Sequence, residues 1–178
     1  MAPSLTPLEP FALEILRARD GRQEALLQAL NAGHPATLFL SLNIPGREKT
    51  PPGAEAFFLW MLARVNAAFP DAVNLSSSFN AFDALGPYRI LGLDNEPLAV
   101  KRQCIELETG HPSQPSTRLI DLDVYTPAGA QMDRSSLGLA ARSCLVCEQR
   151  AVDCIRTRRH DIDEVITRVH ELLAPFRA

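Results

Sequence analysis

Two aspartates one residue apart stand in the segment Arg118–Val124, which has the sequence RLIDLDV. Side chains alternate along a β-strand, so Asp121 and Asp123 would share one face of a strand whose other positions are apolar. Two carboxylates about 6–7 Å apart on one face repel each other unless a cation or a basic group neutralises them. The spacing therefore predicts a metal site, and the alternative is a solvent-facing edge strand whose aspartates stay hydrated.

A second acidic pair comes earlier, because the segment Leu98–Glu108 ends in IELE. We predict a strand here, with Glu106 and Glu108 on one face and next to the strand that carries Asp121. Three or four converging carboxylates could hold Mg²⁺ against substrate phosphates, as two such ions do in phosphoryl or nucleotidyl transfer. A strand of this pattern is typical of nucleotidyltransferase-like sites. The alternative for Glu106 and Glu108 is a hydrated strand surface.

A group of metal-ligand residue types follows, with the spacing Cys144-x2-Cys147-x6-Cys154-x5-His160. Cys-x2-Cys can offer two thiolates to one Zn²⁺, and a further Cys and His would complete a closed, structural tetrahedron. A helix starting near Cys147 would carry Cys154 two turns on along the same face, so zinc would staple two helices together. The alternatives are buried reduced cysteines or a redox Cys-x-x-Cys pair. Cys104 stands apart, and we expect it to pack in the core.

Charge is distributed unevenly along the chain. The formal net charge is −3, which gives no general attraction to nucleic acid. Between Arg134 and Arg159, however, six arginines stand against two acidic residues. This arginine sector suits an anionic ligand or an acidic protein partner, and the alternative is a solvated helix face. The arginines are Arg134, Arg142, Arg150, Arg156, Arg158 and Arg159, and the acids are Glu148 and Asp153.

Composition and the N-terminus indicate the cellular compartment. No apolar run reaches membrane-spanning length, and the start MAPSLTPLE lacks the basic and apolar parts of a signal peptide. We therefore expect a cytoplasmic protein that does not contact a membrane and whose cysteines stay reduced. Three of the four cysteines lie within eleven residues, which favours a metal site over a disulfide framework.

The remaining sequence predicts the elements that position these residues. The length of 178 residues fits a single domain, and 46% hydrophobic residues are enough for a core. We expect strands at Ala36–Ile44, Ala72–Phe79 and Tyr88–Leu93, and a buried helix at Ala54–Val65.

Capping signals predict helices at both ends of the chain. Thr6–Glu9 has the form of a capping box, and Asp20 indicates a second helix start. Asp161 and Glu164 form a further capping box before an apolar helix face. Helices around a block of strands predict an α+β domain with a mixed or mostly antiparallel sheet. Residues 134–178 would be a C-terminal helical subregion that bears the Cys and His residues.

The segments KRQCIELE and RLIDLDVYTPAG, with HP between them, resemble the citrate lyase holo-acyl-carrier-protein synthases. So does ARSCLVCEQRAVDCIR with its following His. This family is also called apo-citrate lyase phosphoribosyl-dephospho-CoA transferase. The resemblance covers Lys101 to the C-terminus well, and Ala18–Gln23 and Ile44–Gly46 more loosely. It implies transfer of a phosphoribosyl-dephospho-CoA group from a triphosphate precursor to a serine of the citrate lyase acyl carrier subunit, with release of diphosphate.

The resemblance also implies roles for individual residues. Asp121 and Asp123 would hold Mg²⁺, and Glu106 or Glu108 would be a further ligand or the base for the serine hydroxyl. The arginine sector would meet the carrier, since such proteins are usually acidic. The candidates for phosphate binding are Lys101, His111, Arg118, Arg134 and Arg142.

Two further features of the resemblance bear on substrate binding. Arg19 and Arg22 match the family pattern, although helix-surface ion pairing would explain them equally. The link Ser113–Thr117 is longer than in the family and lacks its glycine, so serines would have to serve where a Gly/Ser turn approaches phosphates through backbone N–H groups. Two other functions share some of these residues. They are a zinc-stapled interaction module for an acidic partner, and a metal-dependent phosphohydrolase without a carrier acceptor.

Overall fold

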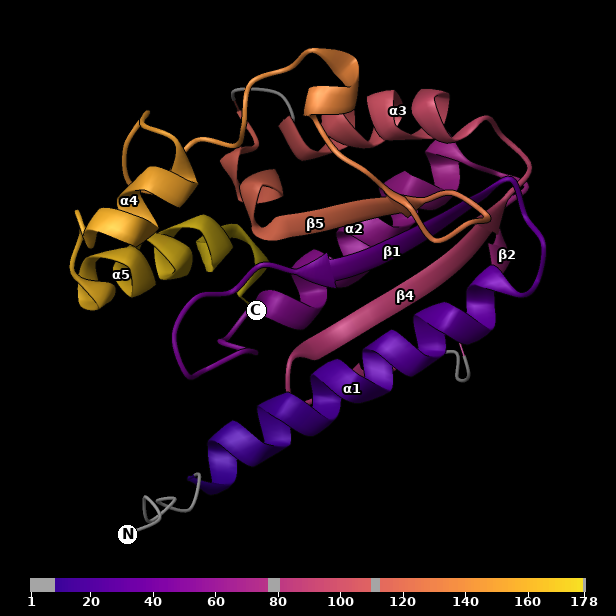
Figure 1. Ribbon diagram of the computed structural model, residues 1–178. Coiled ribbons are helices and arrows are strands. Elements are labelled where there is room, and N and C mark those ends of the chain that lie inside the picture. The colour runs from indigo at the N-terminus through magenta and orange to yellow at the C-terminus, as the bar shows by residue number, and fades with distance from the viewer. Residues whose placement is uncertain (1–8, 77–80, 110–112, 178) are drawn as a thin grey trace, which may run out of the picture.

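The protein is built around an antiparallel sheet whose strands run in the order β2-β4-β1-β5-β6, with β3 paired to β4 outside this path (Figure 1). The computed structural model describes residues 9–76, 81–109 and 113–177, and all strand pairings within them are antiparallel. The predicted α+β class with a mostly antiparallel sheet is confirmed. The strands are β1 (Ala36–Leu42), β2 (Val73–Asn74), β3 (Phe82–Asp83), β4 (Gly86–Leu93), β5 (Ile120–Tyr125) and β6 (Gln131–Met132).

Helices cover both faces of this sheet (Figure 1). Helices α2, α3 and α5 pack on one face, and α1 lies across β1 and β4 on the other. Helix α4 precedes α5 near one end of β5, so the C-terminal helices flank the sheet. The helices are α1 (Pro10–Leu30), α2 (Ala54–Ala68), α3 (Pro97–Thr109), α4 (Ala151–Thr157) and α5 (Ile162–Leu173), with 3₁₀ turns η1 (Pro115–Leu119), η2 (Ser135–Leu137) and η3 (Ala174–Phe176).

Strand β1 lies at the centre because its sequence, ATLFLSL, offers apolar side chains to both faces. Leu38 and Leu40 belong to the main core beneath α2 and α3, whereas Phe39 packs in a smaller core beneath α1. Cys104 of α3 is fully buried in the main core, as expected. The predicted strands at Ala36–Ile44 and Tyr88–Leu93 and the helix at Ala54–Val65 are thus confirmed as β1, β4 and α2.

The prediction of a strand at Leu98–Glu108 is wrong, because this segment lies within α3. Pro97 occupies the first turn, and the Glu96 carboxylate accepts hydrogen bonds from the backbone N–H groups of Leu98 and Ala99 at 3.0 and 2.8 Å. Proline at the start of a helix with an acidic cap before it is a helix signal. The alternation of apolar and acidic residues in IELE is too short to outweigh this helix signal, since four residues are compatible with both a helix and a strand.

The helix predictions at the two ends had different outcomes. Asp20 does not start a second helix, because α1 runs through it without a break. Apart from Glu9, the predicted capping box at Thr6–Glu9 lies outside the described residues. Helix α5 is confirmed and Asp161 is its N-cap residue, but the Asp161 side chain makes no capping hydrogen bond, and the Glu164 carboxylate contacts His160 at 3.1 Å.

Two smaller points complete the fold. Of the strand predicted at Ala72–Phe79, only Val73–Asn74 forms a strand (β2) among the described residues. Residues 77–79 lie outside the described residues. Among the described helices, none combines the length and the apolar character that crossing a bilayer would require.

Candidate active site and metal cluster

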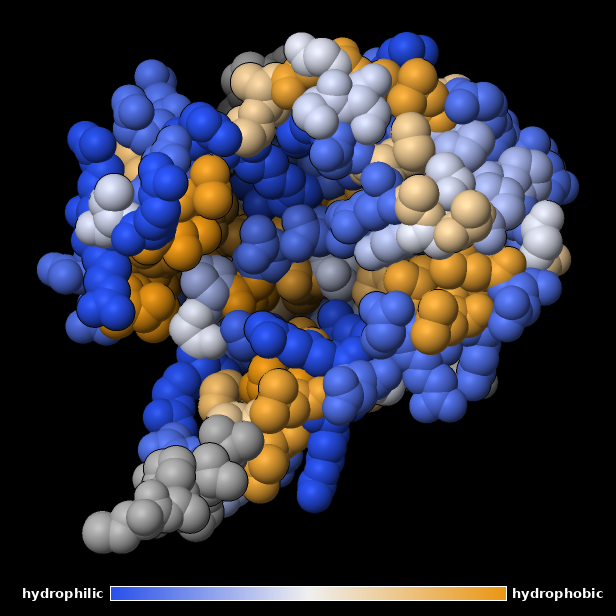
Figure 2. All heavy atoms as spheres, in the orientation of Figure 1, coloured by the Kyte–Doolittle hydropathy of each residue, from blue (hydrophilic) through white to orange (hydrophobic). Residues whose placement is uncertain are grey.

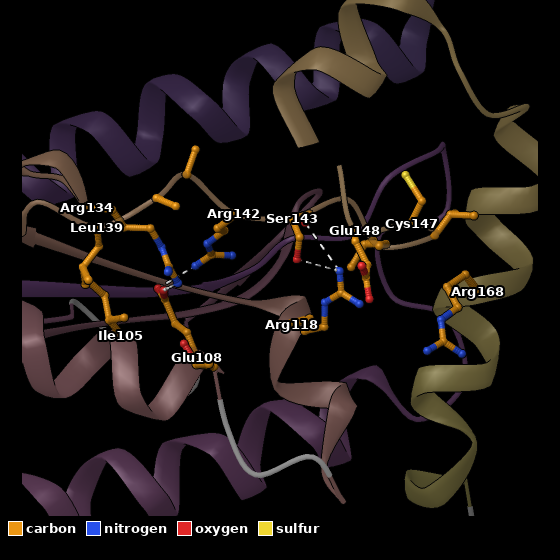
Figure 3. Close-up of a pocket in the computed structure, with 15 residues that line it drawn as sticks. Ile105, Glu108, Arg118, Arg134, Leu139, Arg142, Ser143, Cys147, Glu148 and Arg168 are labelled. Atoms are coloured by element: carbon orange, nitrogen blue, oxygen red, sulfur yellow. Dashed lines mark hydrogen bonds and ion pairs between the residues drawn. The ribbon is translucent and has the colours of Figure 1, made fainter. Parts of the chain in front are cut away.

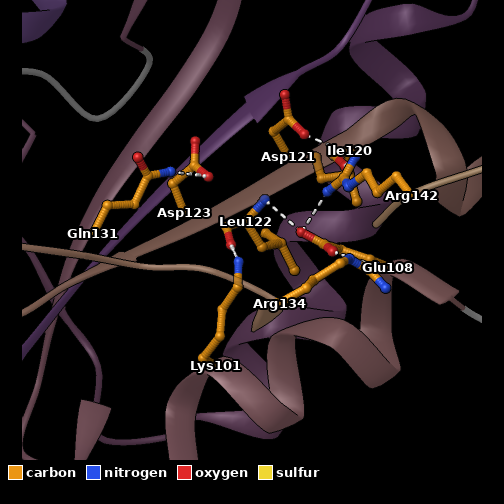
Figure 4. A network of polar contacts seen from close by, with 9 residues as sticks. All are labelled: Lys101, Glu108, Ile120, Asp121, Leu122, Asp123, Gln131, Arg134 and Arg142. Atoms are coloured by element: carbon orange, nitrogen blue, oxygen red, sulfur yellow. Dashed lines mark hydrogen bonds and ion pairs between the residues drawn. The ribbon is translucent and has the colours of Figure 1, made fainter. Parts of the chain in front are cut away.

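The outer edge of β5 is closed by side chains where no strand pairs with it. Strand β6 pairs only with the end of β5, so the backbone groups of Ile120 and Leu122 that point away from β1 need other partners. The Lys101 ammonium donates to the Leu122 carbonyl at 2.8 Å, and Glu108 Oε1 accepts from the Leu122 N–H at 3.0 Å. Arg142 Nη1 donates to the Ile120 carbonyl at 3.0 Å (Figure 4). Three charged side chains therefore form the hydrogen bonds to the edge of β5 that a neighbouring strand would otherwise form.

Glu108 is the centre of this network. Its side chain is 3% exposed and pairs with Arg134 Nη2 at 3.0 Å and Arg142 Nη2 at 2.5 Å. With the Leu122 amide, the carboxylate thus has three N–H donors and holds two guanidinium groups in place. Glu106 lies on the exposed side of the same helix. The predicted convergence of Glu106 with the other acids is therefore wrong, because the side chains of two residues that are two positions apart on a helix point in different directions.

Asp121 and Asp123 project from the same face of β5, as predicted, while the alternate residues are buried. Asp121 Oδ1 pairs with Arg142 Nη1 at 2.7 Å, and Asp123 Oδ1 accepts from Gln131 Nε2 at 2.8 Å. Burial raises the pKa of both carboxyls, opposed by Arg142 at Asp121 and by Lys101 at Asp123. Each carboxylate contacts one side-chain donor, and a cation bound by both would favour their charged forms.

Two adjoining cavities meet at this network. One, which we call the acidic cavity, has a volume of about 490 Å³, and its charged lining residues are the acids Glu108, Asp121, Asp123 and Asp133 and the bases Lys101, Arg134, Arg142 and Arg150. The other, of about 830 Å³, is lined by arginines (Figure 3). Figure 2 shows hydrophilic side chains in the hollow between the C-terminal helices and the rest of this face. Both cavities share Glu108, Arg134 and Arg142, so an acidic site and a basic site lie side by side. The arginines of the larger cavity are Arg118, Arg134, Arg142 and Arg168.

The structure divides the predicted arginine sector into two parts. Arg134 and Arg142 point inward and pair with Glu108. The other four are exposed around α4, although Arg150 also lines the acidic cavity, and they are Arg150, Arg156, Arg158 and Arg159.

Arg168, from α5, also lines the arginine-lined cavity, although no sequence motif predicts a role for it in substrate binding. Its sequence position offers no signal beyond a helix-surface charge with Glu171 three residues on, a pair that the structure also forms at 2.8 Å. Arg118 reaches the same cavity from η1 and donates to Ser143 Oγ at 3.2 Å. Residues from distant segments thus build one basic cavity, which only the tertiary fold reveals.

Other predicted substrate-binding residues have structural partners or lie elsewhere. The Lys101 side chain is buried and its ammonium is bound to the backbone of β5. Arg22 pairs with Asp83 at 2.7 Å and lies over the Tyr88 ring, which ties α1 to β3 and β4. Arg19 is exposed on α1. His111 lies outside the described residues.

The link Ser113–Thr117 uses its buried hydroxyl groups within the fold. The Ser116 hydroxyl donates to the Leu172 carbonyl at 2.6 Å, and the Thr117 hydroxyl donates to the Gln114 carbonyl at 3.1 Å. Both residues are buried. Their hydroxyl groups are therefore not exposed to a triphosphate.

Cys144, Cys147, Cys154 and His160 come together, with one ligand atom of each lying within 4.8 Å of all the others. His160 Nε2 lies 3.2 Å from Cys147 Sγ, which is 3.6 Å from Cys154 Sγ. The second ring nitrogen of His160 contacts Glu164 at 3.1 Å, as carboxylates often orient metal-bound histidines. The cluster could hold a metal ion.

The elements that supply this cluster differ in part from those expected. Helix α4 begins at Ala151, so Cys147 lies in the preceding loop and the two cysteines do not share a helix. All four cysteines of the chain are free thiols. Burial raises the pKa of the Cys144 thiol, but the backbone N–H groups of Cys147 and Val146, together with the thiols of Cys154 and Cys147, give a net downward shift, whereas burial and the neighbouring thiols raise the pKa of Cys154 to about 11. Such N–H groups favour a thiolate, the form that binds metal.

An α+β fold that places carboxylates beside an arginine-lined cavity is typical of enzymes that act on phosphorylated substrates. Residues 12–176 match the family described as apo-citrate lyase phosphoribosyl-dephospho-CoA transferase. The chain belongs to this family.

Individual relatives agree with the family match. An apo-citrate lyase phosphoribosyl-dephospho-CoA transferase of Shigella flexneri is 32% identical over 162 residues, which cover 90% of this chain and 86% of the relative. A probable enzyme of the same name from Streptococcus pyogenes is 30% identical over 92% of this chain and 85% of its own length. Protein CitXG of Leuconostoc mesenteroides is 29% identical over 92% of this chain and 36% of its own length.

Proposed function

We propose that this protein transfers the phosphoribosyl-dephospho-CoA group from its triphosphate precursor to a serine of the apo acyl carrier subunit of citrate lyase. The names of its relatives describe transfer of a phosphoribosyl-dephospho-CoA group to apo-citrate lyase. The observation that carries the proposal is the contact between the two cavities, because Arg142 pairs with Asp121 of the acidic cavity and also lines the arginine-lined cavity. A substrate with a long phosphate chain needs both a cation site and arginines.

The chemistry is a displacement at phosphorus. The serine oxygen forms a bond to the phosphorus next to the ribose, the bond from that phosphorus to the diphosphate oxygen breaks, and the serine proton passes to a base. Asp121 and Asp123 suit Mg²⁺ because they present hard oxygen atoms from one face of β5, each with a single side-chain partner. Mg²⁺ bound there would neutralise charge on the departing diphosphate.

The protein groups would bind and orient the phosphates. Arg118 and Arg168 line the far wall of the basic cavity, and Arg134 and Arg142 line the wall next to the carboxylates. Glu108 holds the last two in position, and its carboxylate oxygens already accept from three N–H donors. Glu108 is therefore a positioning residue in this proposal, in place of the metal ligand or base that its sequence position suggested.

The test is the intact mass of an apo carrier subunit after incubation with this protein, Mg²⁺ and triphosphoribosyl-dephospho-CoA. We expect a mass increase of one phosphoribosyl-dephospho-CoA group, absent with EDTA and reduced at least a hundredfold in rate by Asp121→Asn. The matched control is Glu106→Gln, which changes an exposed acid of α3 and should leave the rate unchanged.

Each other function predicts a different result of the same experiment. A phosphohydrolase would release phosphate or diphosphate without changing the carrier mass. An interaction module would leave both carrier and precursor unchanged. Either result, with a carrier and precursor that another synthase can use, would contradict the transferase.

The carrier subunit would approach over α4. Four exposed arginines lie there beside Ile155, which is 77% exposed. Such a surface fits an acidic partner with an apolar contact at its centre. Arg156→Glu should raise KM for the carrier and leave KM for the precursor unchanged. An equal change in the two KM values would show that the carrier does not bind over α4.

The Cys/His cluster has the ligand set that Zn²⁺ prefers, and its four ligands leave no open position, so the proposed metal is a structural zinc. We also place the fold in the nucleotidyltransferase-like class, since the aspartates alternate with buried residues on β5. Residues 1–178 would form one transferase domain with the subregion 134–178, active in the cytoplasm and without nucleic acid or membrane partners. Metal analysis and a structure with bound precursor test these assignments.

A further inference from the structure

The Cys/His cluster and the basic cavity share one short segment of the chain. Arg142 and Ser143 line the basic cavity, and the next residue, Cys144, is a member of the cluster. The same three residues also line a third cavity, of about 440 Å³, which contains Cys154 and His160 of the cluster. A change in the conformation of this segment would therefore reach both the cluster and the phosphate-binding arginines.

Two arginines of the basic cavity depend on this segment directly. Arg118 donates to the Ser143 hydroxyl at 3.2 Å (Figure 3) and also to the backbone carbonyl of Cys144. Arg142 is itself part of the segment, and its guanidinium reaches Glu108 and the Ile120 carbonyl. The positions of both guanidinium groups thus follow from where the backbone of residues 142–144 lies.

Besides the cluster and these arginine contacts, the backbone of residues 142–144 is held mainly by hydrogen bonds to the start of α4. The segment is tied to the start of α4 by the Cys144 N–H to Gln149 carbonyl bond at 2.7 Å and the Ala151 N–H to Arg142 carbonyl bond at 2.9 Å. Residues 139–141 and 143 are exposed, so burial stabilises them weakly, whereas Cys144 is buried and Leu145 packs against the main core. The loop and α4 therefore form a small unit that is attached to the core through the cluster, the arginines and the Leu145 side chain.

A metal ion at the cluster would join the three parts of this unit. Cys144 and Cys147 come from the loop, Cys154 from α4, and His160 from the turn before α5. Helix α5 is anchored in the main core by Val169, Leu172 and Leu173. Coordination through His160 would thus connect the loop to an element that is itself fixed, and ligand binding of this kind contributes directly to local folding.

We propose that zinc bound by Cys144, Cys147, Cys154 and His160 holds the basic cavity in its binding conformation, so that loss of zinc weakens binding of the phosphorylated substrate. The identity of that substrate rests on the proposed function. The dependence of phosphate binding on zinc rests on the shared segment alone. Zinc occupancy thereby becomes a condition for activity at a site where zinc does no chemistry.

The experiment uses the full chain and inorganic diphosphate as the probe, in a buffer without Mg²⁺. Zinc is counted by elemental analysis, and diphosphate affinity is measured by calorimetry before and after treatment with a zinc chelator. We expect one zinc per chain, a loss of at least tenfold in affinity on its removal, and recovery when zinc is restored. The far-UV circular dichroism should change little, because the sheet and α1 to α3 contain no cluster residue.

Variants separate zinc binding from general damage to the fold. Cys154→Ser should lose both zinc and diphosphate binding, whereas Cys104→Ser, a change at a buried cysteine outside the cluster, should lose neither. His160→Cys keeps four zinc ligands and should keep diphosphate binding. Absence of zinc, or zinc loss with unchanged diphosphate affinity, would overturn the proposal, as would failure of the zinc-loaded protein to bind diphosphate. A protein that shows zinc-dependent diphosphate binding but no carrier modification would contradict the proposed function and leave this dependence intact.

Discussion

Glu108 and the two aspartates of β5 line the same cavity but differ in how many donors they have. Glu108 is almost completely buried and accepts from two arginines and a backbone amide. Asp123 has one amide side chain as a partner, and Asp121 has one arginine that Glu108 also binds. A carboxylate that accepts from three N–H donors positions its neighbours, whereas one with a single side-chain donor has oxygen sites left for a ligand. The number of donors, more than the presence of an acid, separates these roles.

The largest expected effect concerns Glu108. Glu108→Gln removes the charge that two arginines share in a buried position, so it should lower the free energy of unfolding by about 3 kcal/mol. Urea unfolding followed by circular dichroism measures this loss. Glu106→Gln on the exposed side of α3 is the control and should change stability by less than about 0.5 kcal/mol. Equal effects of the two substitutions would remove the distinction between a positioning carboxylate and a surface one.

The next effect concerns the edge of β5. Lys101→Met keeps most of the volume of the buried side chain but leaves the Leu122 carbonyl without its donor. We expect a loss of about 1–2 kcal/mol in the free energy of unfolding. Arg102→Met, at the exposed neighbouring position, serves as the control in the same urea experiment. If both variants unfold at the same urea concentration, the Lys101 bond does not stabilise the strand.

The smallest effect, and the one of opposite sign, concerns Asp123. Because burial raises the pKa of this carboxyl, its charged form destabilises the native state at neutral pH. Asp123→Asn should therefore raise the free energy of unfolding by less than about 1 kcal/mol at pH 7 while transfer is lost. The gain should disappear as the pH falls through the raised pKa, where the native aspartate is also neutral. A variant less stable than the parent at pH 7 would show that Asp123 is as well satisfied as Glu108.

The sequence was informative where the relevant contacts are local. The alternation around Asp121 and Asp123 correctly placed both carboxylates on one strand face, and the cysteine spacing correctly grouped the four residues of the cluster. The alternation in IELE led to a wrong strand prediction, because four residues are too few to distinguish a strand from a helix. The helix signal lies further upstream, at Glu96 and Pro97.

The parts of the candidate site that the sequence did not predict depend on tertiary packing. Arg168 enters the basic cavity because α5 packs against η1, and no pattern in the sequence of α5 indicates this neighbour. Lys101 and Glu108 bind Leu122 because α3 lies along a strand edge that β6 leaves uncovered. Which strand has a free edge is a property of the whole sheet, so the purpose of these two charges could not be inferred from their positions along the chain.

The side chains that close the edge of β5 also affect how one molecule behaves beside another. An uncovered strand edge presents unpaired N–H and C=O groups, which can pair with a strand of a second molecule and begin aggregation. Lys101, Glu108 and Arg142 occupy those groups at Ile120 and Leu122, and they place charge along the same edge. The residues next to the candidate active site therefore also protect the protein in solution. Substitutions made there to alter the chemistry carry a second cost, since they free a strand edge for self-association.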